Sequence, residues 1–283
     1  MTLRLLVCLC CILAGSQAAA DQAPSPVAVP TLTFGVVPQQ ATEALAQRWV
    51  PILDWLSERA GVRIGFRTAP DIPAFEARLA AGHYDLAYMN PYHYTVYQAA
   101  PGYQAFAKER DQRLRGILVV RKDSPITDIA QLRGQPIAFP APAAFAASLL
   151  PQAALRQAGV PIEPHFVRSH ESVYLAVAKG LYPAGGGIER TFENTAPGTR
   201  EQLRVLWQTA HFTPHAFAAH PRVDPLLVAR IRDAMVAMAD SPPGKALLDA
   251  IEFKGIAPAA DADWNDVRAL GLAALAPPAA AAP

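Results

Sequence analysis

The sequence has little cysteine, and all of it lies at one end. Cys8, Cys10 and Cys11 are the three cysteines among 283 residues. Everything after residue 20 therefore has no thiol with which to form a disulfide, bind a metal ion or act as a nucleophile. A scaffold held together by disulfides is excluded.

An excess of charge of either sign is also missing. The chain has 25 basic and 24 acidic side chains, a formal net charge of +1. Binding to nucleic acid depends on clustered cations that neutralise phosphates, so this class of partner is not expected. With 52% hydrophobic and 17% charged residues, the composition is that of a globular protein, long enough for two lobes with cores of their own.

No apolar run of the length of a membrane span, about 18 residues, follows the first twenty residues. At the N-terminus, Arg4 precedes a short apolar stretch over residues 5–13, and Ala18 to Ala20 offer small residues before Asp21. This pattern predicts a cleaved secretory signal over residues 1–20. Ser16 stands where a lipid-bearing cysteine would be needed, so a soluble periplasmic protein is expected.

Familiar catalytic and cofactor motifs are absent. The sequence has no G-x-S-x-G, H-E-x-x-H, P-loop or G-x-G-x-x-G pattern, and residues 185–187 are three glycines that read as a flexible run. His211, His215 and His220 are close in sequence, but Pro214 makes a helix between them improbable, so no metal site is predicted. No cofactor is expected either.

The residues that are present alternate between strand and helix patterns. Apolar alternation over 32–36, 62–66 and 84–89 predicts strands, with helical spacing between them, which indicates an α/β fold. Three helix starts carry capping residues, at Asp128, Asp224-Pro225 and Ser241-Pro242. The Ala/Pro-rich stretches 21–30 and 276–283 predict a disordered leader and tail.

One cluster combines polar and aromatic side chains at the end of a strand. The apolar run up to Met89 stops at Asn90-Pro91, and Tyr88, Asn90 and Tyr92 lie around this stop. Open α/β sheets bind ligands beyond the carboxyl ends of their strands. We therefore predict that Tyr88, Asn90 and Tyr92 line a ligand cleft rather than a core.

With these residues, an ordered set of motifs resembles the phosphate/phosphite/phosphonate-binding periplasmic proteins of ABC transporters. The motifs are Gly35-Val36-Val37-Pro38, Ala69-Pro70-Asp71, residues 85–94, residues 121–125 and residues 132–139. The resemblance implies a type II periplasmic binding protein fold: two lobes, each a mixed, mostly parallel sheet flanked by helices, with the ligand in the hinge cleft. Residues 31–115 with 215–275 would form one lobe and 120–208 the other. The crossings would lie near 114–120 and 208–216, with hinge closure around the ligand.

The same resemblance places the binding residues and shows departures from the family. A Ser-Thr-Ser oxyanion cradle of the family falls on Ala144, Phe145 and Ala146, which have no hydroxyl. A family histidine is kept as His170. Two acidic positions that hold the amine of amino-phosphonates fall on Arg190 and His215, and an aromatic wall falls on Ile72.

Other roles are open for the charged members of this set. Arg190 has an alternative as a salt-bridge partner of Glu189 or Glu193. His170 and His215 have alternatives as capping or hinge residues.

We therefore expect an exported, monomeric binding protein that captures a small anionic solute, other than an amino-phosphonate, for an ABC permease. The alternative partner is the periplasmic domain of a sensor kinase. An enzyme on the same fold would need a nucleophile and a base in the cleft, and the sequence offers no such pair.

Overall fold

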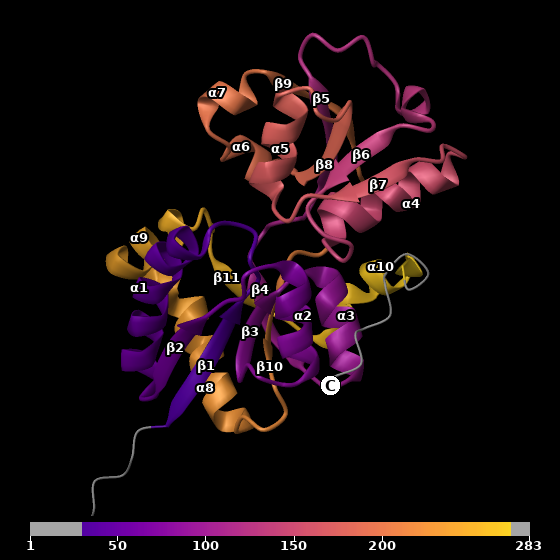
Figure 1. Ribbon diagram of the computed structural model, residues 1–283. Helices are drawn as coiled ribbons and strands as arrows, with labels where there is room; N and C mark the ends of the chain where they lie inside the picture. Colours follow the sequence, from indigo (N-terminus) through magenta and orange to yellow (C-terminus); the bar gives the residue numbers. More distant parts are fainter. Residues whose placement is uncertain (1–29, 273–283) are drawn as a thin grey trace, which may run out of the picture.

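Two β-sheets, each covered by helices, form the body of the protein (Figure 1). The computed structural model describes residues 30–272, so the predicted signal peptide, the tail and all but Pro30 of the leader lie outside it. We call each sheet with its helices a lobe. Lobe 1 holds the strands of residues 31–109, 216–219 and 256–258, and lobe 2 those of residues 116–208.

The sheet of lobe 1 has six strands in the order β11-β4-β10-β3-β1-β2. The parallel pairings are β1 with β2 and β1 with β3, while β10 and β11 run antiparallel to their neighbours. The strands are β1 (Thr31–Val36), β2 (Arg63–Arg67), β3 (Leu86–Met89), β4 (Gln104–Glu109), β10 (Ala216–Ala219) and β11 (Ile256–Pro258). Its helices are α1 (Thr42–Ala60), α2 (Ile72–Ala80), α3 (Pro91–Ala99), α8 (Pro225–Val236), η3 (Ala237–Asp240), α9 (Pro242–Ala250), η4 (Asp261–Trp264) and α10 (Asn265–Arg268).

The sheet of lobe 2 has five strands in the order β7-β6-β8-β5-β9. They are β5 (Gly116–Arg121), β6 (Pro136–Phe139), β7 (Glu163–Phe166), β8 (Ala184–Ile188) and β9 (Leu203–Gln208). Strand β6 is parallel to β7 and β8, whereas β5 is antiparallel to β8 and β9. Its helices are η1 (Ile129–Leu132), η2 (Phe145–Leu149), α4 (Leu150–Gln157), α5 (His170–Ala178), α6 (Glu189–Glu193) and α7 (Pro197–Arg200).

Both sheets are mixed, as the resemblance implies, but parallel pairs are two of five in lobe 1 and two of four in lobe 2. The parallel share is smaller than expected because β5 in lobe 2 and β10 and β11 in lobe 1 run opposite to the other strands of their sheets. The glycine run 185–187 is not a flexible segment. It forms the middle of β8, where every residue is buried.

Capping side chains and a left-handed glycine mark several helix ends. The side chains of Asp224 and Ser241 accept hydrogen bonds from the backbone amides of Leu226 and Gly244, as their capping positions predict. Gly61 takes the left-handed conformation, with φ of 65°, at the end of α1. At the start of α1 the cap position is held by Ala41, so no side chain closes this helix end.

The two lobes are joined through neighbouring segments and through a continuous apolar contact. Leu114 and Phe212, one from each crossing, form an isolated antiparallel bridge. The core of lobe 1 extends across the cleft to Phe145, Leu149 and Ile188 of lobe 2. Within residues 30–272, no helix is long and apolar enough to span a bilayer.

Candidate functional site

A cavity of about 280 Å³ lies between the lobes, close to both crossings. Lobe 1 and the crossings contribute Gln39, Tyr88, Glu109, Gln112, Arg113, Leu114, Arg115, Pro214, His215 and Glu252, and lobe 2 contributes Ile188, Glu189, Arg190, Thr191 and Glu193. Its lining holds three arginines and four glutamates. Its walls therefore have a slight excess of negative charge.

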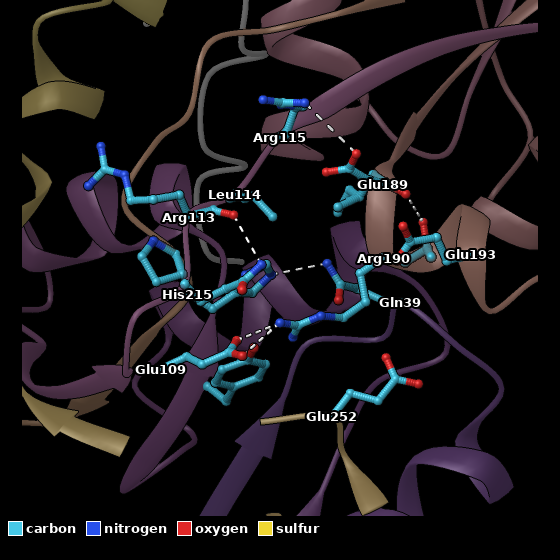
Figure 2. Close-up of a pocket in the computed structure, with 15 residues that line it drawn as sticks. Gln39, Glu109, Arg113, Leu114, Arg115, Glu189, Arg190, Glu193, His215 and Glu252 are labelled. Atoms are coloured by element: carbon cyan, nitrogen blue, oxygen red, sulfur yellow. Dashed lines mark hydrogen bonds and ion pairs between the residues drawn. The ribbon is translucent and has the colours of Figure 1, made fainter. Parts of the chain in front are cut away.

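Arg190 points across the cleft at Glu109 (Figure 2). Its Nη2 lies 2.7 Å from Oε1 and 2.8 Å from Oε2 of Glu109, which ends β4 and has a side chain only 3% exposed. The salt-bridge partner of Arg190 is thus Glu109, and not Glu189 or Glu193. Sequence reasoning missed Glu109, although a carboxylate at the last residue of a strand, directly before a crossing, is a signal that could have found it.

The same contact leaves part of the guanidinium available. Both bonds to Glu109 come from Nη2, and among the described residues no hydrogen-bond acceptor is recorded for Nε or Nη1 of Arg190. The ring of Phe253 packs under the guanidinium, with Cζ 5.3 Å from the ring centroid. Arg190 is therefore held in place by two neighbours while it keeps donors for a ligand.

Arg113 and Arg115 have other partners. Arg113 donates to Thr213, to Asp266 and to the carbonyl of His211, and its side chain extends away from Arg190 (Figure 2). Arg115 donates to Gln208 and lies 3.9 Å from Glu189. These two arginines also line the cavity, but their guanidinium groups bond to residues of the crossings, whereas Arg190 reaches across the cleft between the lobes.

His215 and Tyr88 form a stacked pair beside Arg190. Their ring centroids are 5.0 Å apart at an interplanar angle of 19°. The side-chain amide of Gln39 donates to His215 Nε2 at 3.0 Å, which places the ring proton of a neutral His215 on Nδ1. No hydrogen-bond partner among residues 30–272 is recorded for the Tyr88 hydroxyl, although this side chain is 8% exposed.

Burial controls protonation in the cleft. It lowers the pKa of His215 to about 3, with a further contribution from the charge of Arg190, and it lowers the pKa of His170 to about 4. Burial raises the pKa of Tyr88, and it also raises the pKa of Glu109, which Arg190 offsets only in part. Both histidines are therefore neutral near pH 7 and act as dipolar hydrogen-bonding groups rather than as cations.

The position of the expected oxyanion cradle is closed. Ala144, Phe145 and Ala146 begin the helix formed by η2 and α4, and the space next to them measures about 10 Å³, which is the lower limit for one water molecule. Apolar side chains of Ile72, Leu114 and Ile188 line the same space. Phe145 is 1% exposed, and its ring meets Phe212 edge-on at 5.7 Å.

The remaining predicted residues lie around these two spaces, and His170 also lines a third space between the lobes, of about 620 Å³. Asn90 and His170 border the small one, where Asn90 donates to the carbonyl of Ala143 at 3.1 Å and His170 Nδ1 lies 3.4 Å from the Thr191 hydroxyl. Tyr88 and Arg190 line the larger cavity, and His215 borders both. Tyr92 is in neither: it is half-buried on α3 and packs on the core of lobe 1. Its place in the first turn of α3 directs it away from the cleft side of β3.

The three neighbouring histidines do not converge. His211 lies next to Arg115 at the crossing, His215 lies in the cleft, and His220 packs against Tyr103. Within the described part of the chain, no group of three histidine, cysteine or carboxylate side chains has the geometry of a metal site.

Comparison with known proteins identifies the family. Residues 34–264 match the model of the family described as ABC transporter, phosphonate, periplasmic substrate-binding protein. Among curated proteins, the phosphate-import protein PhnD of Mycolicibacterium smegmatis is 24% identical over 84% of each chain.

Solved structures share the fold. A binding protein component of an ABC phosphonate transporter from Pseudomonas aeruginosa superposes with a TM-score of 0.78 at 18% identity, over 86% of each chain. PhnD1 from Prochlorococcus marinus, solved with methylphosphonate, gives a TM-score of 0.77 at 18% identity over 85% of this chain and 97% of that one. These likenesses support a fold of two mixed sheets flanked by helices, as in type II periplasmic binding proteins.

Proposed function

The chain belongs to the periplasmic substrate-binding proteins of ABC phosphonate transporters, and from this premise we propose that its ligand is a small anion held beside Arg190. Solute capture for an ABC importer is the function of the family. The proposal adds the class of the ligand and its place in the cleft. It also takes residues 31–115 with 215–275 and residues 120–208 as the two lobes that close on the ligand.

One observation carries the proposal: donors of two residues that have no acceptor among residues 30–272 line the same cavity. They are Nε and Nη1 of the Arg190 guanidinium and the Tyr88 hydroxyl, and the neutral ring of His215 lies beside them. A buried donor that stays unpaired costs about 1–3 kcal/mol, so these groups favour a ligand that can accept from them. A compact anion with several oxygen atoms meets this requirement.

We expect that amino-phosphonates are poor ligands. Ala144 and Ala146 supply no hydroxyl, and Phe145 fills the position next to them. Two lost charge-assisted hydrogen bonds, at about 1.5–3 kcal/mol each, predict binding at least about 100-fold weaker than in a pocket that has the hydroxyl cradle, and Arg190 and His215 stand where acids would hold the amine. Isothermal titration of phosphate, phosphite, methylphosphonate, 2-aminoethylphosphonate, other oxyanions and small carboxylates checks this. Submicromolar binding of 2-aminoethylphosphonate would contradict it.

We also propose that the chain reaches the periplasm through a cleaved signal peptide. Arg4, the apolar stretch 5–13 and Ala18 to Ala20 carry this prediction. N-terminal sequencing of the protein from the periplasmic fraction should begin within two residues of Asp21. A product that keeps Met1 would overturn the prediction.

The partner follows from the family: a membrane permease receives the solute. A sensor-kinase domain stays the alternative prediction, and growth on the identified solute separates the two, because deletion of an importer component abolishes uptake. We propose further that the chain acts as a monomer and without covalent chemistry.

A further inference from the structure

The buried ion pair of the cleft places a carboxylate of the protein where a bound anion would lie. Glu109 comes from lobe 1 and Arg190 from lobe 2, and both line the 280 Å³ cavity. We propose that Glu109 determines the specificity of this site: it occupies Arg190 as a tethered anion, so that a ligand binds by taking its place at the guanidinium. This inference rests on the proposed function, because it assumes an anionic ligand.

The geometry makes Glu109 a substitute for a ligand. Both of its oxygens accept from the same nitrogen, at 2.7 and 2.8 Å, and the side chain is almost fully removed from solvent. A carboxylate so placed cancels the charge that Arg190 brings into the cavity. The replacement of a family acid by Arg190 therefore does not by itself turn the cleft into a cationic site.

Displacement of Glu109 costs free energy, and this cost makes the site selective among ligands. A buried carboxylate that loses its counter-ion is destabilised unless it moves to solvent or takes up a proton. A monoanion that makes only the contacts with Arg190 that Glu109 already makes gains too little binding free energy to offset the cost of displacing Glu109. An anion that also accepts from the Tyr88 hydroxyl gains more, so the ion pair selects for ligands with several acceptor atoms.

The other charges near Glu109 do not replace Arg190. Lys254 acts on Glu109 in the same direction as Arg190 but only through space, and Glu252 acts in the opposite direction. Tyr88 and His215 are neutral near pH 7 and adjoin the same cavity. Once Arg190 turns to a ligand, Glu109 therefore has a higher proton affinity than before.

This gives the sign of a pH dependence. If the pKa of Glu109 rises when a ligand takes Arg190, binding is accompanied by proton uptake, and affinity for an anion increases as the pH falls. His170 and His215, with pKa values of about 4 and 3, stay neutral from pH 7.5 to pH 5. These two histidines therefore contribute no slope in this range, and the part of the slope that Glu109→Gln abolishes is attributable to Glu109 when the probe itself does not titrate.

Titration with methanesulfonate, which stays a monoanion over this range, tests the inference. The variants are Glu109→Gln, which keeps the shape and removes the charge, and Glu193→Gln as the matched control. Glu193 lines the same cavity, and no contact with Arg190 is recorded for its side chain. We expect at least about 10-fold tighter binding for Glu109→Gln and less than about 3-fold change for Glu193→Gln. Wild-type affinity should rise between pH 7.5 and pH 5, with no such slope in Glu109→Gln.

Each result has a defined meaning. Equal effects of the two substitutions, or a wild-type affinity that is independent of pH, would overturn the role of Glu109 while an anionic ligand stands. Failure of both the wild type and Glu109→Gln to bind any anion of the panel would overturn the proposed ligand class as well. Circular dichroism checks that Glu109→Gln is folded. If it is unfolded, the role of Glu109 is tested with Glu109→Asp, which retracts the carboxylate, and with the wild-type pH series.

Discussion

Replacing Phe145 by alanine should lower the free energy of unfolding by about 3–5 kcal/mol. The ring is 1% exposed and belongs to the core cluster that crosses from lobe 2 to lobe 1. It also packs edge-on against Phe212 of the second crossing. Its removal leaves a void between the lobes, next to a space that Ile72, Leu114 and Ile188 line together with the buried side chains of Asn90 and His170.

Urea unfolding followed by circular dichroism measures this effect. Phe166→Ala is the matched control, because Phe166 makes a comparable ring contact with Phe139 but is 44% exposed. The control should lose far less stability than Phe145→Ala. Equal losses would show that Phe145 does not connect the lobes. The small size of the space beside Ala144 to Ala146 would then have another cause.

The sequence predicted those parts of the structure that depend on neighbours in the chain. The caps at Asp224 and Ser241 were foreseen because a capping side chain reaches only two or three residues ahead. That Ala144 to Ala146 carry no hydroxyl is equally visible in the sequence, because it is a matter of residue identity alone. The sequence did not show which residues surround this space. That needed the three-dimensional positions of Ile72, Leu114 and Ile188.

The partner of Arg190 depends on tertiary structure and could not be read in this way. Glu109 is 81 residues away, and the pairing exists only because the end of β4 faces the start of α6 across the cleft. Glu189 and Glu193 were the candidates that sequence proximity offers. The difference matters for function. An ion pair within α6 would involve lobe 2 alone, whereas the observed ion pair joins the two lobes.

The glycine run 185–187 shows a further limit of predicting structure from neighbouring residues in the sequence. Three consecutive glycines are typical of a flexible segment, yet residues 185–187 lie in the buried strand β8. They are glycines because neighbouring elements come too close for side chains: the space above Gly187 is taken by Tyr174, and that above Gly186 by the carbonyl of Ala147 and the ring of Phe139. Such crowding is visible only in three dimensions.

Gly186→Ala should therefore be strongly destabilising. A methyl group at this position would overlap the backbone carbonyl oxygen of Ala147, which belongs to η2 and cannot rotate away as a side chain can. Overpacking of a core costs about 1–3 kcal/mol, and a backbone obstacle places the expected loss near the upper end, at about 3 kcal/mol. The displaced helix start would also disturb Phe145, so closure of the lobes should weaken together with stability.

The control is Gly198→Ala in α7, where an added methyl group has no neighbour within 4 Å. Alanine has the higher helix propensity, so this variant should be unchanged or more stable by up to about 1 kcal/mol. Differential scanning calorimetry of both variants measures the contrast, and small-angle scattering reports the spacing of the lobes. A Gly186→Ala protein as stable as Gly198→Ala would mean that η2 can move away from β8 at little cost. In that case Phe145 could leave the cleft to admit a ligand, and the cavity beside Arg190 and the space it now fills would act as one site.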